Sequence, residues 1–502
     1  MMHEMQLRQK RKDEIMTVDF EKVLRENKEK WENREYIFEK KNGVYEAVTY
    51  GAFIDKTRAF AKYMLNEGYQ GKNILLYGAN CINLMVADLA VLHYVGTGVC
   101  VSKEWKYDDI YRAIKMLDVP CVIYGEDKAE VIDEIRKAMP ELRYIALGEI
   151  DELAEEMKAK SEALSCIPQS DEACCKIIFS SGTTAKPKAV MLCKRNIFAG
   201  VPSLLRRCPF NETDVDYLFL PLSHTYGGIY NFLYGLVSGF SIYLCSSVNE
   251  MAQEILEVNP TIFCGVPAIY RRFYEGYGEH IAMAFGPNIK YLFCGGACLD
   301  EDIRKAYKNS GLSLMDAYGL SETASTFSIQ YPDDLDCKCV GTIAEEIEVI
   351  VLNPDENGIG EIAVRGDNVF LGYAKDEELT KSLFTEDGFF RTGDMGYLLP
   401  DEEHGSHRLY LTGRIKKILL GENGENVEPT HIEKLICEKN SNINKALIYM
   451  QDNILSCHVY LLDREERDWE KFFEEINAGL PSYEKVRRFD VVIDSVERRL
   501  KQ

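Results

Sequence analysis

Short apolar runs alternate with amphipathic stretches along most of the chain. The runs rich in β-branched and aromatic residues predict strands, and the longer amphipathic stretches predict helices. The predicted strands are NILLYG (73–78), PCVIYG (120–125), KIIFSS (176–181), DYLFLPL (216–222), FSIYLC (240–245), TIFCGV (261–266) and IKYLFCGG (289–296). Residues 50–67 and 300–310 are predicted helices. Strands that alternate with helices indicate an α/β fold built in layers.

The pattern changes in two places further along. Residues 343–389 are rich in strands and turns, as in IEVIVLNPDENGIGEIAVRG, which predicts a small antiparallel sheet or a distorted barrel. A boundary between two domains is predicted near Gly413 and Arg414. The remaining residues predict a hairpin, a helix (429–438), two strands, a second helix (468–478) and a last strand (489–493), which is a compact α+β unit.

Composition narrows the function classes. Of 502 residues, 46% are hydrophobic, which suffices for a sizeable core, and the net charge of −22 argues against a nucleic-acid-binding surface. A local basic loop in an acidic protein can still bind a polyanion such as ATP. The sixteen cysteines include no CxxC pair, so reduced core thiols are expected rather than a zinc site.

The sequence offers no candidate for membrane insertion or export. The first residues, MMHEMQLRQKRKDEIM, are charged and lack the apolar stretch of a signal peptide. The most apolar region, residues 74–101, is interrupted by Asn80, Asn83, Asp88 and His93, so it is expected to be buried helix and strand. We therefore expect a cytoplasmic protein without a transmembrane segment.

One loop has the composition of a phosphate site. In IIFSSGTTAKPKAVML an apolar strand opens into hydroxyl donors (Ser180, Ser181, Thr183 and Thr184), Gly182, and the cations Lys186 and Lys188. Small residues let the backbone approach an anion, and hydroxyls and ammonium groups can bind a polyphosphate. Composition alone leaves a polar surface turn as an equal alternative. The loop is not the GxxxxGK[ST] loop of P-loop NTPases.

The same run closely resembles the (Y/F)TSGTTGxPKGV signature of the adenylate-forming (ANL) superfamily, which includes acyl-CoA synthetases, luciferases and the adenylation domains of peptide synthetases. Ala185 and Ala189 stand where that signature has glycine. The resemblance implies that the loop binds the phosphates of ATP, that Lys188 is catalytic, and that Thr184 contributes to a Mg²⁺ site. It also implies a large N-terminal AMP-binding domain (1–413) of two sheets layered with helices plus a small β-barrel, and a mobile α+β C-terminal domain (414–502).

Further segments resemble the family's motifs in family order. LPLSHTYGG implies that His224 lines an acyl pocket, and YLFCGGACL implies adenine contacts at Gly295, Gly296 and Ala297. MDAYGLSETA implies nucleotide contacts from Asp316, Ala317, Tyr318, Gly319 and Ser321. In the same motif Glu322 is implied as the Mg²⁺ ligand, and Ala317 replaces the usual glycine.

Later motifs extend the implied site. GEIAVRG and the LGY that follows it resemble a family segment, which implies a structural role. FRTGDMGYL implies that Asp394 binds the ribose hydroxyls. LTGRIKKILLGENGENVEP resembles the hinge between the two domains, where Arg414 would reach ribose or phosphates, Lys416 would be the hinge residue, and Gly424 would enter the thiol channel. The usual C-terminal segment with its catalytic lysine is replaced by VVIDSVERRLKQ, in which Lys501 is the nearest candidate and a solvated chain end is the alternative.

The resemblance implies a ligase that uses ATP and Mg²⁺ to form an acyl-adenylate and then passes the acyl group to CoA. EVNPTIFCGVPAIYRRFYE and GENGENVEP resemble long-chain acyl-CoA synthetases, which implies a fatty acid. Two alternatives stay open. One is a stand-alone adenylation enzyme that loads the phosphopantetheine of a separate acyl carrier protein. The other is a non-catalytic adenylate-binding protein, which the altered C-terminus motivates.

Overall fold

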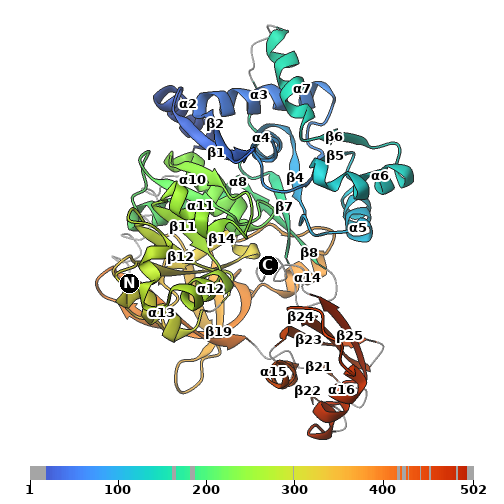
Figure 1. Cartoon of the computed structure of the whole chain (residues 1–502), viewed down its shortest axis with the longest axis vertical. Coiled ribbons are helices and arrows are strands. Elements are labelled where there is room, and N and C mark those ends of the chain that lie inside the picture. The colour runs from blue at the N-terminus through green and yellow to red at the C-terminus, as the bar shows by residue number, and fades with distance from the viewer. Residues whose placement is uncertain are drawn as a thin grey trace. The chain divides into compact units, whose positions relative to one another are not determined.

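The structure, a computed structural model, describes residues 19–160, 166–180, 187–297, 299–414, 419–420, 426–427, 429–440, 442–451, 454–481 and 484–493. The chain divides into two compact units (Figure 1). The first unit contains Met1–Ser246 and Met251–Thr412, and the second contains Ser247–Glu250 and Gly413–Gln502. The assignment of residues 1–413 and 414–502 as an AMP-binding and an associated domain stays a prediction.

A seven-stranded sheet in the first unit has the order β18-β8-β7-β4-β3-β5-β6. Its strands are β3 (Asn73–Tyr77), β4 (Thr97–Cys100), β5 (Cys121–Tyr124), β6 (Arg143–Ala146), β7 (Cys174–Ser180), β8 (Lys188–Cys193) and β18 (Gly372–Tyr373). The five strands from β7 to β6 are parallel, whereas β8 runs antiparallel to β7 and β18 antiparallel to β8. The predicted phosphate loop therefore connects two adjacent antiparallel strands.

Helices cover both faces of this sheet. Leu75 and Tyr77 of β3 pack in one buried cluster with residues of α5 (Tyr107–Leu117) and α6 (Ala129–Ala138). Ile74 and Leu76 pack in another cluster with residues of α3 (Tyr50–Asn66) and α4 (Ile82–Ala90). Successive strand side chains point to opposite faces, so this near-continuous apolar run is the pattern of a strand buried on both sides.

A thirteen-stranded sheet has the order β16-β17-β19-β20-β15-β14-β13-β12-β11-β9-β10-β1-β2. Its first seven strands in chain order are β1 (Glu35–Lys41), β2 (Val44–Thr49), β9 (Val215–Leu218), β10 (Ser241–Leu244), β11 (Ile262–Gly265), β12 (Tyr291–Cys294) and β13 (Leu314–Leu320). The others are β14 (Ser325–Ile329), β15 (Thr342–Ile343), β16 (Glu348–Leu352), β17 (Gly360–Arg365), β19 (Phe390–Asp401) and β20 (Ser406–Arg414).

Strand β13 joins the two halves of this large sheet. Its first half pairs in parallel with β12, as Asp316 does with Cys294, and its second half pairs antiparallel with β14, as Ala317 does with Ile329. The nucleotide motif MDAYGLSETA therefore lies where the parallel part of the sheet becomes antiparallel.

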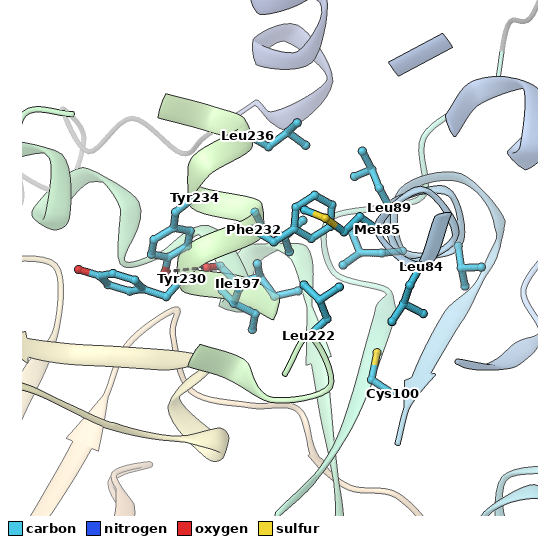
Figure 2. Packing of buried hydrophobic residues seen from close by; sticks show 14 of the residues in the cluster. Leu84, Met85, Leu89, Cys100, Ile197, Leu222, Tyr230, Phe232, Tyr234 and Leu236 are labelled. Carbon is cyan, nitrogen blue, oxygen red and sulfur yellow. Dashed lines mark hydrogen bonds between the residues drawn. The ribbon is translucent and has the colours of Figure 1, made fainter. Parts of the chain in front are cut away.

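The largest hydrophobic core contains side chains from both sheets of the first unit. Figure 2 shows Met85 and Leu89 of α4 facing Phe232 and Leu236, which come from the helical segment 226–238. Tyr234 belongs to the same core, and its hydroxyl donates a 3.0 Å hydrogen bond to the Ile197 carbonyl (Figure 2). Burial of this apolar surface provides most of the free energy that holds the two sheets together.

The remaining helices of the first unit flank these sheets. They are α2 (Phe20–Trp31), η1 (Val91–Val95), η2 (Glu126–Lys128), α7 (Glu149–Ala159), α8 (Lys194–Phe198), α9 (Val201–Arg207), η3 (Tyr226–Leu233), α10 (Tyr234–Ser238), α11 (Met251–Val258), α12 (Pro267–Tyr277), η4 (Gly278–Ala284), α13 (Glu301–Asn309), η5 (Ser321–Thr323) and α14 (Glu377–Ser382).

The second unit is a small α+β structure. It contains the hairpin of β21 (Leu419–Leu420) and β22 (Asn426–Val427), followed by α15 (Pro429–Lys439), β23 (Ile443–Gln451), β24 (Ile454–Leu461), α16 (Trp469–Ala478) and β25 (Arg488–Ile493). β24 pairs antiparallel with β23 and parallel with β25. Ile436 of α15 and Phe473 of α16 pack with Ile448 of β23 in one core.

The predicted α/β layers and the small α+β part are confirmed. The antiparallel strands predicted as a small sheet or barrel are hydrogen-bonded to the large sheet through β14 and β13, so they continue that sheet. The cysteines that the structure describes are free thiols. Within the described ranges no helix combines the length and the apolar character needed to cross a membrane.

Candidate active site

The phosphate motif is anchored by two residues of a strand hairpin. Ser180, the last residue of β7, pairs with Lys188, the first residue of β8. The Ser180 hydroxyl oxygen is buried and has no hydrogen-bond partner among the described residues. A buried hydroxyl is costly without a partner, and a phosphate oxygen would accept a hydrogen bond from it. The predicted contacts at Ser181, Gly182, Thr183, Thr184 and Lys186 lie outside the described residues.

Glu322 and Lys188 are linked through one aromatic residue. Glu322 lies in η5, and its Oε1 accepts a 2.7 Å hydrogen bond from the hydroxyl of Tyr373 on β18. The ammonium nitrogen of Lys188 lies 5.1 Å from the centroid of the same tyrosine ring, within the range of a cation–π contact. Glu322 and Lys188 are half-buried, and Tyr373 is buried.

Tyr318 and Asp394 form a second pair. The Tyr318 hydroxyl donates a 2.6 Å hydrogen bond to Oδ2 of Asp394, which is buried on β19. The backbone N–H of Asp394 donates to the Thr392 hydroxyl at 3.1 Å. Each carboxylate oxygen can accept more than one hydrogen bond, so the Tyr318 contact by itself does not prevent Asp394 from binding a ribose hydroxyl.

Asp316 uses its carboxylate inside the fold. It is buried and forms an ion pair with the guanidinium of Arg304 on α13, while its backbone N–H donates to the Gln330 side chain at 2.9 Å. Burial raises the pKa of Asp316 to about 6, and the charge of Arg304 opposes that rise. The Asp316 side chain already has a structural partner, so the predicted nucleotide contact would be made by the Asp316 backbone.

The loop predicted to contact adenine lies beside the motif predicted to contact the acyl group. A methyl group on Gly295 would approach a ring carbon of Tyr226 to 3.1 Å, and the Tyr226 hydroxyl donates to the Phe293 carbonyl at 2.9 Å. Gly296 has a φ of +82°, in the left-handed region that favours glycine. Gly296 and Ala297 are exposed, so a flat ligand can reach the backbone of this turn.

His224 is exposed to solvent, yet protein surrounds it closely enough to lower the pKa of its imidazole. Its Nδ1 accepts a hydrogen bond from the Tyr226 N–H at 3.3 Å, which fixes the orientation of the ring. A neutral, accessible imidazole that is hydrogen-bonded to Tyr226, the neighbour of Gly295, suits the wall of a pocket for a carboxylic acid.

The other predicted residues fall into two groups. Ala317 is buried in β13, and Gly319 and Ser321 are half-buried next to Tyr318 and Glu322. Arg414, the last residue of β20, is exposed and belongs to the second unit. Lys416, Gly424 and Lys501 lie outside the described residues.

The carboxylates of the described residues could hold Mg²⁺ only together with phosphate oxygens of the nucleotide. Among the described residues no group of three or more His, Cys, Asp or Glu side chains could hold a metal ion. Mg²⁺ in nucleotide enzymes is held by one or two carboxylates together with substrate phosphates and water. Glu322 fits this arrangement, because the Tyr373 hydroxyl that donates to one of its oxygens is neutral, and a carboxylate has lone pairs enough to bind a cation as well.

Comparison with known proteins identifies the family. Residues 24–374 match the model of the AMP-binding enzyme family. The chain belongs to that family. This matched region of the AMP-binding enzyme contains Lys188, His224, Tyr318, Glu322 and Tyr373, whereas Asp394 and Arg414 follow it.

Two curated relatives and one solved structure describe the similarity further. The chain is 25% identical to "Long chain acyl-CoA synthetase 7, peroxisomal" of Arabidopsis thaliana, covering 78% of this chain and 65% of that protein. It is 24% identical to "Long-chain-fatty-acid--CoA ligase ACSBG2" of Xenopus laevis, covering 86% and 67% respectively. Its fold resembles that of ATP-bound MatB from Rhodopseudomonas palustris, with a TM-score of 0.70, 20% identity and 94% of each chain covered. The chain spans about two thirds of the length of these curated relatives.

The sequence does not predict the contacts of Tyr373 with Glu322 and Lys188, because the LGY segment resembles scaffold. The only signal was a tyrosine next to a glycine, and glycine-tyrosine pairs are common at turns. Nothing in the sequence pairs Tyr373 with Glu322, since that contact depends on β18 joining the edge of the seven-stranded sheet.

Proposed function

We propose that this AMP-binding enzyme is an ATP-dependent acid–thiol ligase that adenylates a fatty acid and transfers the acyl group to CoA. The single observation that carries the proposal is a constellation in the first unit. Lys188, Glu322 and Asp394 come from three separate motifs, and each contacts a tyrosine of the same region, Tyr373 or Tyr318. Such a grouping supplies a cation for phosphate, a carboxylate for Mg²⁺ and a carboxylate for ribose.

The proposed reaction has two steps. In the first step a carboxylate oxygen of the acid bonds to the α-phosphorus of ATP, the bond from that phosphorus to the bridging oxygen breaks, and pyrophosphate leaves. In the second step the thiolate sulfur of CoA bonds to the acyl carbon, the bond from that carbon to the phosphate oxygen breaks, and AMP leaves.

The residues are proposed to act by position and charge. Lys188 and the Ser180 hydroxyl would bind phosphate oxygens as negative charge moves toward pyrophosphate. Glu322 would hold Mg²⁺, which neutralises phosphate charge when bound. In phosphoryl and adenylyl transfer, charge stabilisation and alignment of the reacting atoms do most of the catalytic work.

The proposed choice of a fatty acid and CoA as substrates is based on the names of the relatives. The curated relatives are named as long-chain acyl-CoA synthetases and long-chain-fatty-acid–CoA ligases, which supports a fatty acid as the acid and CoA as the thiol. Arg414 and Lys501, in the predicted small domain at 414–502, stay proposed catalytic residues. The cytoplasm stays our predicted compartment, although one relative is named as peroxisomal.

The test is pyrophosphate release from Mg²⁺-ATP with acids from acetate to long-chain fatty acids and benzoate, with and without CoA. We expect release that depends on a fatty acid and increases with CoA. The variant Glu322→Gln should abolish release, while Glu345→Gln, which alters an exposed carboxylate elsewhere, should leave it unchanged.

Two other outcomes would overturn the proposal. Acid-dependent release that CoA does not accelerate, but a phosphopantetheinylated carrier protein does, would establish the carrier-loading enzyme. Binding of ATP without release for any acid would establish the non-catalytic adenylate-binding protein.

A further inference from the structure

We propose that Tyr373 is a positioning residue for adenylation, which holds Glu322 through its hydroxyl and Lys188 through its ring. This inference rests on the proposed function, because it assigns Glu322 to Mg²⁺ and Lys188 to phosphate. Tyr373 itself is not proposed to contact either ligand.

The contact with Glu322 is made at two points. The Tyr373 hydroxyl donates to the carboxylate at 2.7 Å, and the N–H of Phe370 in the same segment donates to the Glu322 carbonyl at 2.9 Å. The segment therefore fixes both the backbone of η5 and the orientation of the Glu322 side chain. A carboxylate with one oxygen held in this way keeps its remaining lone pairs for a cation.

The contact with Lys188 is supported by the pairing of β18 with β8. Tyr373 pairs with Val190 in the ladder of β18 and β8, and the N–H of Ala374 donates to the Ala189 carbonyl at 2.9 Å. Lys188 begins that same strand, and its ammonium lies 5.1 Å from the Tyr373 ring centroid. A ring under the ammonium limits the rotamers of a long, flexible side chain.

The segment thus connects the two sheets of the first unit at the site. β8 belongs to the seven-stranded sheet, whereas Glu322 directly follows β13 of the large sheet. Without this connection, a small shift between the sheets would change the separation of Glu322 and Lys188. Catalytic constellations depend on such separations being held to fractions of an ångström.

Tyr373 is itself rigidly held. Its N–H donates to the Thr380 hydroxyl at 2.9 Å, and its ring packs edge-on against Phe370 at 5.0 Å. Gly372 has a φ of +134°, and a methyl group there would lie 2.8 Å from a Thr380 carbon, so the turn before Tyr373 requires glycine.

Outer hydrogen bonds that orient a metal ligand typically change metal affinity or activity by about 10- to 100-fold when they are lost. Two variants separate the two contacts. Tyr373→Phe removes the hydroxyl and keeps the ring over Lys188, while Tyr373→Leu removes both. The control is Tyr307→Phe, which removes a buried 2.8 Å hydrogen bond to the Tyr270 carbonyl.

The main measurement is binding of ATP by calorimetry as a function of Mg²⁺ concentration, with EDTA as the metal-free arm. For Tyr373→Phe we expect the Mg²⁺ concentration that gives half of the metal's effect on ATP affinity to rise about 10-fold. The ATP affinity without metal should be unchanged. For Tyr373→Leu we expect metal-free ATP affinity to fall as well. Tyr307→Phe should match the wild type in both arms.

A kinetic measurement adds a second check. The Mg²⁺ concentration that gives half-maximal pyrophosphate release should rise with Tyr373→Phe, and Glu322→Gln combined with Tyr373→Phe should lose no more Mg²⁺ affinity than Glu322→Gln alone, because the tyrosine acts through that carboxylate. A wild-type Mg²⁺ dependence in Tyr373→Phe would overturn the inference. If the wild-type protein binds Mg²⁺-ATP but releases no pyrophosphate, the proposed function fails while the binding arms still test Tyr373.

Discussion

The hydroxyl of Tyr318 lies 2.6 Å from a carboxylate oxygen of Asp394, although the two residues are 76 positions apart. The contact joins the motif predicted to stack on adenine with the motif predicted to bind ribose. The Tyr318 ring also packs edge-on against Phe327 at 5.2 Å, so both ends of this side chain are held. One side chain thereby links the position predicted to stack on adenine to the carboxylate predicted to bind ribose.

Replacing Tyr318 with phenylalanine is expected to raise the KM for ATP about 10-fold, because the ring remains and only the hydrogen bond to a charged group is lost. Steady-state pyrophosphate release at varied ATP measures this effect. The control is Tyr144→Phe, which removes a 2.9 Å hydrogen bond to the Met139 carbonyl and should leave the KM unchanged. An equal rise in both variants would mean that general loosening, not the contact with Asp394, sets the KM.

The ion pair of Lys176 and Asp88 offers a test of stability. Both side chains are buried, with Lys176 Nζ at 2.7 and 2.5 Å from the two carboxylate oxygens of Asp88. Asp88→Asn should destabilise the first unit by about 3–5 kcal/mol, because the ammonium is left buried without its counter-charge. Urea unfolding followed by tryptophan fluorescence measures the loss.

The matched double variant separates the charge from the packing. Asp88→Leu combined with Lys176→Met replaces both charges by apolar groups, and it should recover most of the stability lost in Asp88→Asn. If the double variant is as unstable as the single one, the hydrogen-bonding capacity of this site rather than its charge balance is what the fold requires.

Asp216 makes the stability of the folded protein depend on pH. Burial raises the pKa of this carboxyl to about 7, while hydrogen bonds from the Asn231 side chain and the Tyr217 backbone oppose the rise. The folded protein therefore holds a proton that the unfolded chain releases near its ordinary value of 3.8. The stability that this proton contributes is present below that value and is lost as pH rises through about 7.

Asp216→Asn should remove this dependence. From pH 5 to pH 8 the free energy of unfolding of the wild type should fall by about 2–3 kcal/mol more than that of the variant. Melting temperatures across that range measure the difference, and Asp387→Asn on an exposed turn serves as control. Parallel pH profiles for Asp216→Asn and the wild type would contradict the assignment of a protonated Asp216.

Lys501 is the proposed substitute for the family's C-terminal lysine. If it contacts the carboxylate and α-phosphate, Lys501→Ala should slow pyrophosphate release about 100-fold, the size of effect seen when one charge-stabilising group is lost. Transfer of the acyl group from a pre-formed acyl-adenylate to CoA should be unchanged. Unchanged pyrophosphate release would show that another residue supplies the charge.

The sequence predicted the elements and the family more fully than it predicted the contacts. Strand and helix periodicity located β3, β5 and α3 to within a few residues, because each carries a continuous apolar run or an apolar face. Motif order identified Glu322, Asp394 and Lys188 as candidates. These predictions depend on local pattern, which a single sequence contains.

Contacts between distant segments could not be predicted in this way. The nucleotide contact of Asp316 stays a prediction, but the sequence gives no sign that its carboxylate pairs with Arg304, because that pair depends on α13 packing against β13. Lys176 sits in an apolar run, and only the fold supplies Asp88 as its partner. The sequence predicts a small antiparallel sheet or distorted barrel at residues 343–389, but it does not show that these strands join the large sheet through β14 and the second half of β13.

The pairing of strands also constrains how the chain can fold during synthesis. Ile37 of β1 pairs with Ile242 of β10, and Tyr373 of β18 pairs with Val190 of β8. The N-terminal hairpin must therefore wait for β10 to leave the ribosome, and β8 keeps an open edge until β18 arrives. Such long-range pairings fold slowly and leave strand edges exposed to other chains. Cooling weakens hydrophobic association and chaperones cover exposed strands, so expression at low temperature or with chaperones should raise the yield of folded protein.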